Sequence, residues 1–324
     1  MLYNLSNDIL YNICYNNNIN TEKDLQLEML KLRNIMMTNK SLFNFIILRY
    51  EKLYLSNLDS NYKNIYFKYN KFYEINIFED FSIINLDKFK NCKCVSLRSC
   101  YNITYVNCLK NVKFLDLSNC FELEDVSMLG HCKKLELSNC HKITNVSNLG
   151  NIPYLDLSHC DNITDISTLG NHKYLNLKGT NVCNISNLSN VETLNISYNY
   201  NIYDISSLKD VYNLDVSFCL NVELITVMNN TVFTAEHTNL VDDDILYLKN
   251  VNTLNLKKNN YISDLSPLIK TKRLDIRNCR NIRILPKKNI LDYINVSRDN
   301  YYANLINLNI NDLNIKKIDI DNYS

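Results

Sequence analysis

The stretch "LDLSHCDNITDISTLGN" at residues 155–171 decides the fold, because the chain repeats it. "LELSNCHKITNVSNLGN" occupies residues 135–151, and "LDLSNCFELEDVSMLGH" occupies residues 115–131. The first apolar residue of each "LxL" triplet, called the marker below, recurs here every 20 residues. A unit this short cannot bury its apolar side alone, so neighbouring units must supply the core. The repeat therefore predicts a solenoid.

The marker column extends outward from this stretch in both directions. It comprises Ile75, Val95, Leu115, Leu135, Leu155, Leu175, Leu194, Leu214, Phe233, Leu254, Leu274 and Ile294, with Leu53 and Leu313 expected to begin a ragged first and last unit. Alternation around each marker predicts a short strand with one buried face. Returning to a strand every 19–21 residues makes successive strands parallel and leaves no room for a long helix. We expect 3₁₀ or extended segments on the return side, giving an α/β solenoid of about 12–14 units.

Two further columns predict how each unit turns. An aspartate precedes the return segment in several units and can cap the turn through its carboxylate. These aspartates are Asp125, Asp165, Asp204 and Asp264. The "LG" glycines Gly130, Gly150 and Gly170 are expected to supply corners with positive φ.

Cysteines form a column five residues after the marker. The column reads Cys100, Cys120, Cys140, Cys160, Thr180, Asn199, Cys219, Thr238, Asn259 and Cys279. Asn and Thr turn inward and bond the backbone at bends, and a thiol is a small buried group that can fill the same place. We therefore expect reduced, buried thiols that form a structural ladder.

A metal site is the sharper alternative for these cysteines. Cys120, His131, Cys132, Cys140, His141, His159 and Cys160 lie in adjacent units. Zinc sites favour closely spaced pairs such as C-x₂₋₄-C, whereas this ladder steps with the repeat. We expect no metal and no cofactor.

Composition limits the function classes. The 324 residues carry 35 Lys and Arg against 34 Asp and Glu, so no overall charge draws the chain to nucleic acid or membrane. No Gly-rich phosphate loop, H-E-x-x-H or G-x-S-x-G motif occurs, which argues against an enzyme. The start has neither a basic region nor a long apolar run, and no apolar run elsewhere is long enough to span a membrane. We expect an intracellular, cytoplasmic protein.

The pattern "LxLSxCxxITDxSxL" resembles the cysteine-containing class of leucine-rich repeats over roughly residues 50–318. The resemblance implies a curved solenoid with parallel strands on its concave face and a protein ligand. These units are shorter than is usual for that class and are closer to internalin-type and trypanosomatid-type repeats, so full convex helices are not expected. The predicted domains are a helical segment at 1–48, the repeats at 49–318 and a tail at 319–324.

The N-terminal segment resembles an F-box. Helically spaced apolar residues at Leu5, Ile9, Leu10 and Ile13 follow its opening pattern L-P-x-E-[IL]-L-x-x-I, with Ser6 in place of Pro and Asp8 in place of Glu. Two further helical runs follow. F-box proteins with leucine-rich repeats are substrate receptors of SCF-type ubiquitin ligases, which implies that residues 1–48 bind the adaptor. The alternative is a helical cap that covers the core of the first repeat.

Strand positions one before, one after and three after the marker should point outward on the concave face. In the first half they give Phe114, Tyr154 and Tyr174, then Asp116, Glu136 and Asp156, then Ser118, Ser138 and Ser158. Like charges on neighbouring strands are unfavourable, so we interpret the acidic column as a ligand site flanked by aromatic anchors. A solvated face without a ligand is the alternative.

The last repeats are locally basic. They contain Lys257, Lys258, Lys270, Lys272, Arg273, Arg277, Arg280, Arg283, Lys287 and Lys288. Nucleic-acid binding through these residues is a remote alternative, because a solvated charged face fits the neutral overall charge better.

Overall fold

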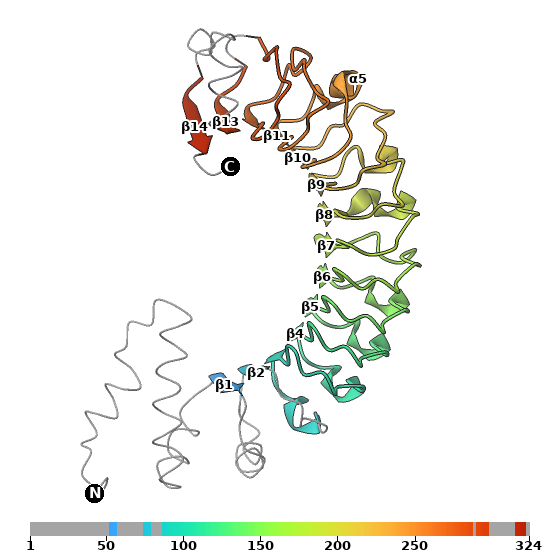
Figure 1. Cartoon of the computed structure of the whole chain (residues 1–324). Coiled ribbons are helices and arrows are strands. Elements are labelled where there is room, and N and C mark those ends of the chain that lie inside the picture. The colour runs from blue at the N-terminus through green and yellow to red at the C-terminus, as the bar shows by residue number, and fades with distance from the viewer. Residues whose placement is uncertain (1–51, 57–73, 79–85, 288–289, 298–314, 322–324) are drawn as a thin grey trace, which may run out of the picture.

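Parallel strands that line the inner side of an arc form the architecture (Figure 1). The computed structural model describes residues 52–56, 74–78, 86–287, 290–297 and 315–321. Within them one open sheet of 14 strands follows the chain order, and each strand pairs with its sequence neighbours. The return segments form the outer side of the arc. The molecule is therefore a solenoid of parallel strands whose sheet lines the concave side.

The strands are short and lie one per unit. They are β1 (Lys52–Ser56), β2 (Glu74–Phe78), β3 (Cys94–Ser96), β4 (Phe114–Asp116), β5 (Lys134–Glu136), β6 (Tyr154–Asp156), β7 (Tyr174–Asn176), β8 (Thr193–Asn195), β9 (Asn213–Asp215), β10 (Val232–Thr234), β11 (Thr253–Asn255), β12 (Arg273–Asp275), β13 (Tyr293–Ser297) and β14 (Lys317–Asp321).

The markers pair with one another across the sheet, which confirms the predicted register. Leu115 pairs with Leu135, and Phe233 pairs with both Leu214 and Leu254. The last unit differs from the expectation. Ile294 pairs with Ile318, so Ile318 takes the marker position in β14, whereas Leu313 lies outside the described residues.

The outer layer consists of 3₁₀ turns, as a 20-residue unit requires. They are η1 (Asp87–Phe89), η2 (Asn107–Leu109), η3 (Ser127–Leu129), η4 (Ser147–Leu149), η5 (Ser186–Asn190), η6 (Ser206–Leu208) and η7 (Leu246–Leu248), with one α-helical turn, α5 (Asp242–Ile245). In the part of the chain that the structure describes, no helix has the length and apolar character needed to cross a membrane.

The aspartates cap these turns as predicted. Oδ1 of Asp125 accepts the backbone N–H of Ser127 at 2.9 Å, and Asp165 accepts that of Ser167 at the same distance. The carboxylate satisfies a donor that a short 3₁₀ turn leaves open. Asp204 and Asp264 make the equivalent bonds at 2.7 Å.

The prediction that the "LG" glycines supply corners with positive φ was wrong. Gly130 and Gly150 have φ of −59° and −60°, which any residue adopts. Space is the reason for glycine here. A Cβ on Gly170 would lie 2.5 Å from the carbonyl oxygen of Asn187 in the next coil, and Cβ atoms on Gly130 and Gly150 would meet Asn148 and Thr168 in the same way. Each glycine lets two coils approach closely.

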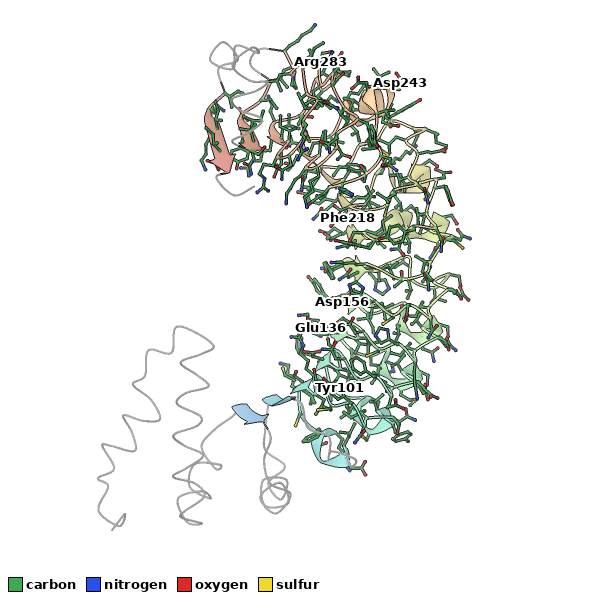
Figure 2. All side chains as sticks on the ribbon, in the orientation of Figure 1. Tyr101, Glu136, Asp156, Phe218, Asp243 and Arg283 are labelled. Atoms are coloured by element: carbon green, nitrogen blue, oxygen red, sulfur yellow. The ribbon has the colours of Figure 1, made fainter. Side chains whose placement is uncertain are left out.

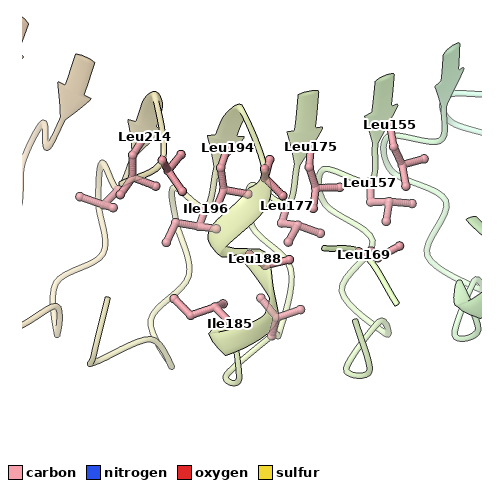
Figure 3. Close-up of a cluster of buried hydrophobic side chains, with 14 of the residues drawn as sticks. Leu155, Leu157, Leu169, Leu175, Leu177, Ile185, Leu188, Leu194, Ile196 and Leu214 are labelled. Carbon is pink, nitrogen blue, oxygen red and sulfur yellow. The ribbon is translucent and has the colours of Figure 1, made fainter. Parts of the chain in front are cut away.

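The core lies between the sheet and the outer turns (Figure 3). The marker and the residue two positions later point into it from each strand, as Leu155 and Leu157 do with no exposed surface. Leu188 of η5 meets this layer from the outer side. A further buried column, eleven residues after the marker, contains Val106, Val126, Val146 and Ile166 and was not predicted.

The cysteine column forms the predicted structural ladder. Sγ of Cys120, Cys140 and Cys160 donates to a backbone carbonyl of the preceding coil, at 3.3, 3.2 and 3.1 Å. Asn199 makes the same kind of contact, because its Nδ2 donates to the carbonyl of Leu177 at 2.8 Å. The thiol and the amide thus satisfy equivalent carbonyls, which explains why they exchange. Cys219 and Cys279 make the same bond to the preceding coil at 3.1 and 2.9 Å. The hydroxyls of Thr180 and Thr238 donate to a carbonyl of their own coil. Nδ2 of Asn259 donates to a carbonyl of its own coil and to one of the preceding coil.

Burial keeps these thiols protonated. It raises the pKa of Cys140 to about 12 and that of Cys279 to about 12. All described cysteines are free thiols. Among the residues that the structure describes, no three His, Cys, Asp or Glu side chains lie close enough together to hold a metal ion.

The column three residues before the marker is mostly apolar, but single polar residues in it bond the preceding coil. Sγ of Cys132 donates to the carbonyl of Val112 at 3.3 Å, and Oγ1 of Thr271 donates to that of Val251 at 2.9 Å. His172, only 2% exposed, bonds the carbonyl of Ile152 through Nδ1. Desolvation by burial lowers the pKa of this imidazole. Polar residues therefore enter the core where a neighbouring coil offers a carbonyl.

Candidate functional site

The inner surface of β4–β7 brings the predicted aromatic and acidic residues together. Glu136 and Asp156 lie on the inner side of the arc, whereas Asp243 lies on its outer side (Figure 2). Phe114 and Tyr154, one position before their markers, are 39% and 46% exposed. Adjacent strands lie about 4.8 Å apart, so these residues form one continuous surface. We call the surface of Phe114, Tyr154, Tyr174, Asp116, Glu136 and Asp156 the acidic face.

The aspartates of the acidic face also stabilise the fold, contrary to the interpretation from sequence. Oδ1 of Asp116 accepts the backbone N–H of Ser118 at 2.9 Å, and Oδ1 of Asp156 accepts that of Ser158 at 2.8 Å. Asparagines take the same place in later coils: Asn176, Asn195 and Asn255 accept the N–H two residues ahead at 3.1, 2.9 and 3.0 Å. An Asx turn therefore accounts for the side-chain oxygen in this column. It does not account for the negative charge.

The second carboxylate oxygen bonds along the sheet. Oδ2 of Asp116 accepts the hydroxyl of Ser96 at 3.2 Å, and Oδ2 of Asp156 accepts Nδ2 of Asn176 at 3.0 Å. Both aspartates are consequently held in one orientation. Glu136 differs, because its Oε1 pairs with Nζ of Lys134 at 2.6 Å.

The negative charges of the acidic face raise the pKa values of neighbouring side chains. A hydrogen bond to Glu136 raises the pKa of Lys134, and the charges of Asp116 and Asp156 add to it. Burial raises the pKa of Tyr174, with further contributions from Asp156 and Glu136. Three carboxylates thus face one ammonium group across β4–β6.

The serine column does not point outward as predicted. Ser118 and Ser158 are buried, at 3% and 7% exposure, and Ser138 is half-buried. The backbone N–H groups of Ser118 and Ser158 donate to the preceding aspartates, which holds these two serines in the turn. They belong to the turn and are not a contact surface for a ligand. The predicted adaptor-binding residues Leu5, Ile9, Leu10 and Ile13 lie outside the described residues.

Several basic side chains of the last repeats are paired with carboxylates. Glu236 holds Lys257 at 3.3 Å and Lys258 at 3.0 Å. Arg277 pairs with Asp275 at 2.7 Å. In the second half of the sheet, basic side chains lie beside Glu236 and Asp275, so both signs of charge occur there.

A column four residues after the marker was missed by the sequence reasoning. Its non-glycine members in the described repeats all have positive φ: Ser99, Asn119, Asn139, His159, Tyr198, Phe218, His237, Lys258 and Asn278. Asn and Gly adopt this conformation readily, whereas bulky side chains rarely do. The signal in the sequence was therefore a bulky aromatic residue in a column that contains Asn at 119, 139 and 278 and Gly at 179.

Comparison with known proteins shows a likeness to solved leucine-rich repeat structures. An internalin from Listeria monocytogenes shares 20% identity, with 77% of this chain and 82% of that chain covered, at a TM-score of 0.48. A structure of the mouse RP105/MD-1 complex shares 17% identity. The match covers 82% of this chain and 55% of that chain, at a TM-score of 0.47. The functional domain of InlJ from L. monocytogenes, which includes a cysteine ladder, shares 18% identity. The match covers 79% of this chain and 59% of that chain, at a TM-score of 0.43. No protein-family model and no curated protein matches the sequence.

Proposed function

We propose that this chain is a non-catalytic protein-binding scaffold whose acidic face holds a positively charged partner. The observation that carries the proposal is the pair of exposed rings, Phe114 and Tyr154, beside three carboxylates on neighbouring strands. Aromatic side chains supply much of the energy at protein interfaces when they become buried. The carboxylates steer the approach of the partner and select a positively charged one.

The geometry of the aspartates favours binding over simple solvation. Their orientation is fixed by the turn and by bonds along the sheet, so a partner does not have to order them. Preorganisation of this kind lowers the cost of association. Asparagine serves the turn equally well in later coils, so the turn itself does not require the charge at Asp116 and Asp156.

Neutralising the acidic face tests this proposal. The triple variant Asp116→Asn, Glu136→Gln, Asp156→Asn keeps the turn acceptors and removes three charges. We expect partner retention in an affinity purification, quantified by mass spectrometry, to fall at least about tenfold, since close interfacial charge pairs contribute on the order of 1.5 kcal/mol or more each.

A matched control removes three charges from the outer side. Glu122 and Glu124 pair with Lys142, and Asp125 caps η3 in a column where Asn145 does the same. The variant Glu122→Gln, Glu124→Gln, Asp125→Asn should retain partners like the wild type. Equal loss in both variants, or loss in the outer variant alone, would place the site elsewhere.

A more specific role follows from the N-terminal resemblance: the scaffold is the substrate receptor of an SCF-type ubiquitin ligase, with residues 1–48 bound to the adaptor. The support is the apolar pattern Leu5, Ile9, Leu10 and Ile13. An amphipathic helix binds a groove through anchors of this spacing. The repeats would then select the target and the N-terminal segment would recruit the ligase.

Charged residues at Leu5, Ile9 and Leu10 should abolish adaptor binding, because a buried charge removes each apolar anchor. Surface plasmon resonance with a purified adaptor measures the loss. The repeats should retain the circular dichroism of the wild type. If the unaltered chain does not bind the adaptor, residues 1–48 serve only as a cap.

A further inference from the structure

Three aromatic side chains occupy strained backbone positions at the edge of the concave sheet. Tyr198, Phe218 and His237 have φ of 61°, 61° and 52°. The left-handed region costs a residue with a Cβ roughly 1–2 kcal/mol, and Asn relieves part of this cost through local hydrogen bonds. Asn119 and Asn139 fill the same position in earlier coils. Bulky residues in this conformation are a recurrent feature of functional sites.

These side chains stack into a continuous rib. The ring centroids of Tyr198 and Phe218 are 4.3 Å apart, and those of Phe218 and His237 are 5.1 Å apart. Tyr198 and Phe218 are half-buried and His237 is exposed. We call this set the aromatic rib. It lies along the edge of β8–β10, and Phe218 is on the inner side of the arc (Figure 2).

The fold does not need aromatic residues in this column. In earlier coils the asparagines form their own ladder: Nδ2 of Asn139 donates to Oδ1 of Asn119 at 2.9 Å, and Nδ2 of Asn119 donates to Oγ of Ser99 at 3.3 Å. Asparagine therefore stabilises both the backbone conformation and the stacking of coils. The aromatic rib replaces that arrangement with partly exposed aromatic rings.

Lysines border the rib. Nζ of Lys178 lies 4.8 Å from the ring centroid of Tyr198, and Nζ of Lys258 lies 5.9 Å from that of Phe218. Glu236 positions Lys258 and Lys257 through its carboxylate. Burial opposes ionisation of Glu236, but the hydrogen bonds and charges of the two lysines hold its pKa below the usual value. The rib is thus bordered by three lysines, two of them paired with Glu236, and Asp215 of β9 adds a second carboxylate in the coil of Phe218, which leaves a net positive charge.

We propose that the aromatic rib binds an extended protein segment in which acidic residues flank an apolar one. The apolar side chain packs on the ring edges of Tyr198 and Phe218, and the carboxylates pair with Lys178 and Lys258. Both bordering charges are cationic, so charge complementarity selects an acidic segment. This surface is separate from the acidic face, which has the opposite charge and lies on other strands.

The stacking favours a peptide over a nucleic acid. Single-stranded nucleic acids bind such surfaces by stacking bases on the faces of aromatic rings. Both neighbours of Phe218 in the rib are stacked on it, Tyr198 at 14° and His237 at 28° between ring planes. Its faces are therefore occupied and its edge is available. An edge supports packing of an aliphatic or aromatic side chain and not insertion of a base.

An immobilised peptide array tests the proposal with the full chain. The core sequence Glu-Gly-Phe-Gly-Glu places three side chains on one face of an extended segment. We expect it to retain at least about tenfold more protein than Gln-Gly-Phe-Gly-Gln or Glu-Gly-Ala-Gly-Glu. The variant Phe218→Asn should lose this preference. The acidic-face variant should keep it, so the two sites succeed or fail separately.

A matched control distinguishes binding from folding. Phe121 is also stacked between two rings, Tyr101 at 4.8 Å and His141 at 5.7 Å, but its backbone is not left-handed. Phe121→Asn should leave peptide retention unchanged. Phe218→Asn should leave the melting temperature near that of the wild type, because Asn suits φ near 60°. A large fall in the melting temperature without selective peptide binding would make the rib structural.

Other outcomes also overturn the proposal. Equal retention of acidic and neutral peptides would remove the role of Lys178 and Lys258. Retention of the acidic peptide by Phe218→Asn would remove the role of the rib. Binding of an oligothymidylate in preference to the peptide, lost in Phe218→Asn, would assign the surface to nucleic acid.

Discussion

Gly170→Ala is expected to lower the free energy of unfolding by about 2–4 kcal/mol, which is large for the addition of one methyl group. The new Cβ would lie 2.5 Å from the carbonyl oxygen of Asn187. That oxygen belongs to the backbone of the neighbouring coil, so the clash is relieved only when two stacked coils move apart. Urea denaturation followed by circular dichroism measures the loss, and a change in the m-value would show that the coils on either side have uncoupled.

Gly179→Asn is the matched comparison. Gly179 has φ of +63°, but the column already contains asparagines with φ near 60°. The atoms nearest to its Cβ are those of the His159 ring, which can rotate away. We expect a change of less than about 1 kcal/mol, because Asn tolerates this conformation. If Gly170→Ala were as stable as Gly179→Asn, the close approach of the coils would not be the reason for glycine at position 170.

The repeat register could be predicted from sequence because it rests on a period that many columns share. Leu155 and Cys160 recur with the same spacing, so a shift of one residue would have broken several columns at once. The period also excluded long outer helices. Both conclusions depend on chain length between strands, which is a property of the sequence alone.

The roles of individual residues in the columns could not be obtained in this way. The sequence gives glycine at both 170 and 179 without its cause. Gly170 is required because a Cβ there would clash with the neighbouring coil, whereas Gly179 lies at positive φ. Asp156 looks like a free surface charge, yet one of its oxygens caps a turn. Such distinctions depend on contacts between coils, which a period does not specify. The same limit explains the last strand, where the irregular spacing concealed Ile318.

The aromatic rib illustrates a signal that was present but not read. Small or polar residues, among them Asn119 and Asn139, fill the first half of the column, and a change to Tyr198 and Phe218 is conspicuous once the column is known to be left-handed. The sequence shows the exchange but not the backbone conformation that makes it costly. Structure was needed to convert an exchange of residue types into a functional hypothesis.

Phe233→Ala is expected to destabilise the solenoid by about 3–5 kcal/mol, the range for a buried Phe truncated to Ala. Phe233 is the marker of β10 and has no exposed surface. Two residues later this unit has Ala235, also fully buried, where other units have a larger side chain such as Leu157. The phenyl ring therefore occupies volume that two aliphatic side chains share elsewhere, and its removal leaves a cavity that the small Ala235 cannot reduce.

A double-mutant cycle tests this compensation directly. Phe233→Leu alone should leave a cavity, and Ala235→Leu alone should overpack the strand, so each is expected to cost about 1–3 kcal/mol. The double variant restores the "LxL" triplet of Leu155 and Leu157 and should recover most of the loss. The coupling energy between the two positions should be about 1–3 kcal/mol, measured by urea denaturation of the four proteins. Additive effects within about 0.5 kcal/mol would mean that the two side chains pack independently, with the core of this coil set by its neighbours and not by the exchange of volume within β10.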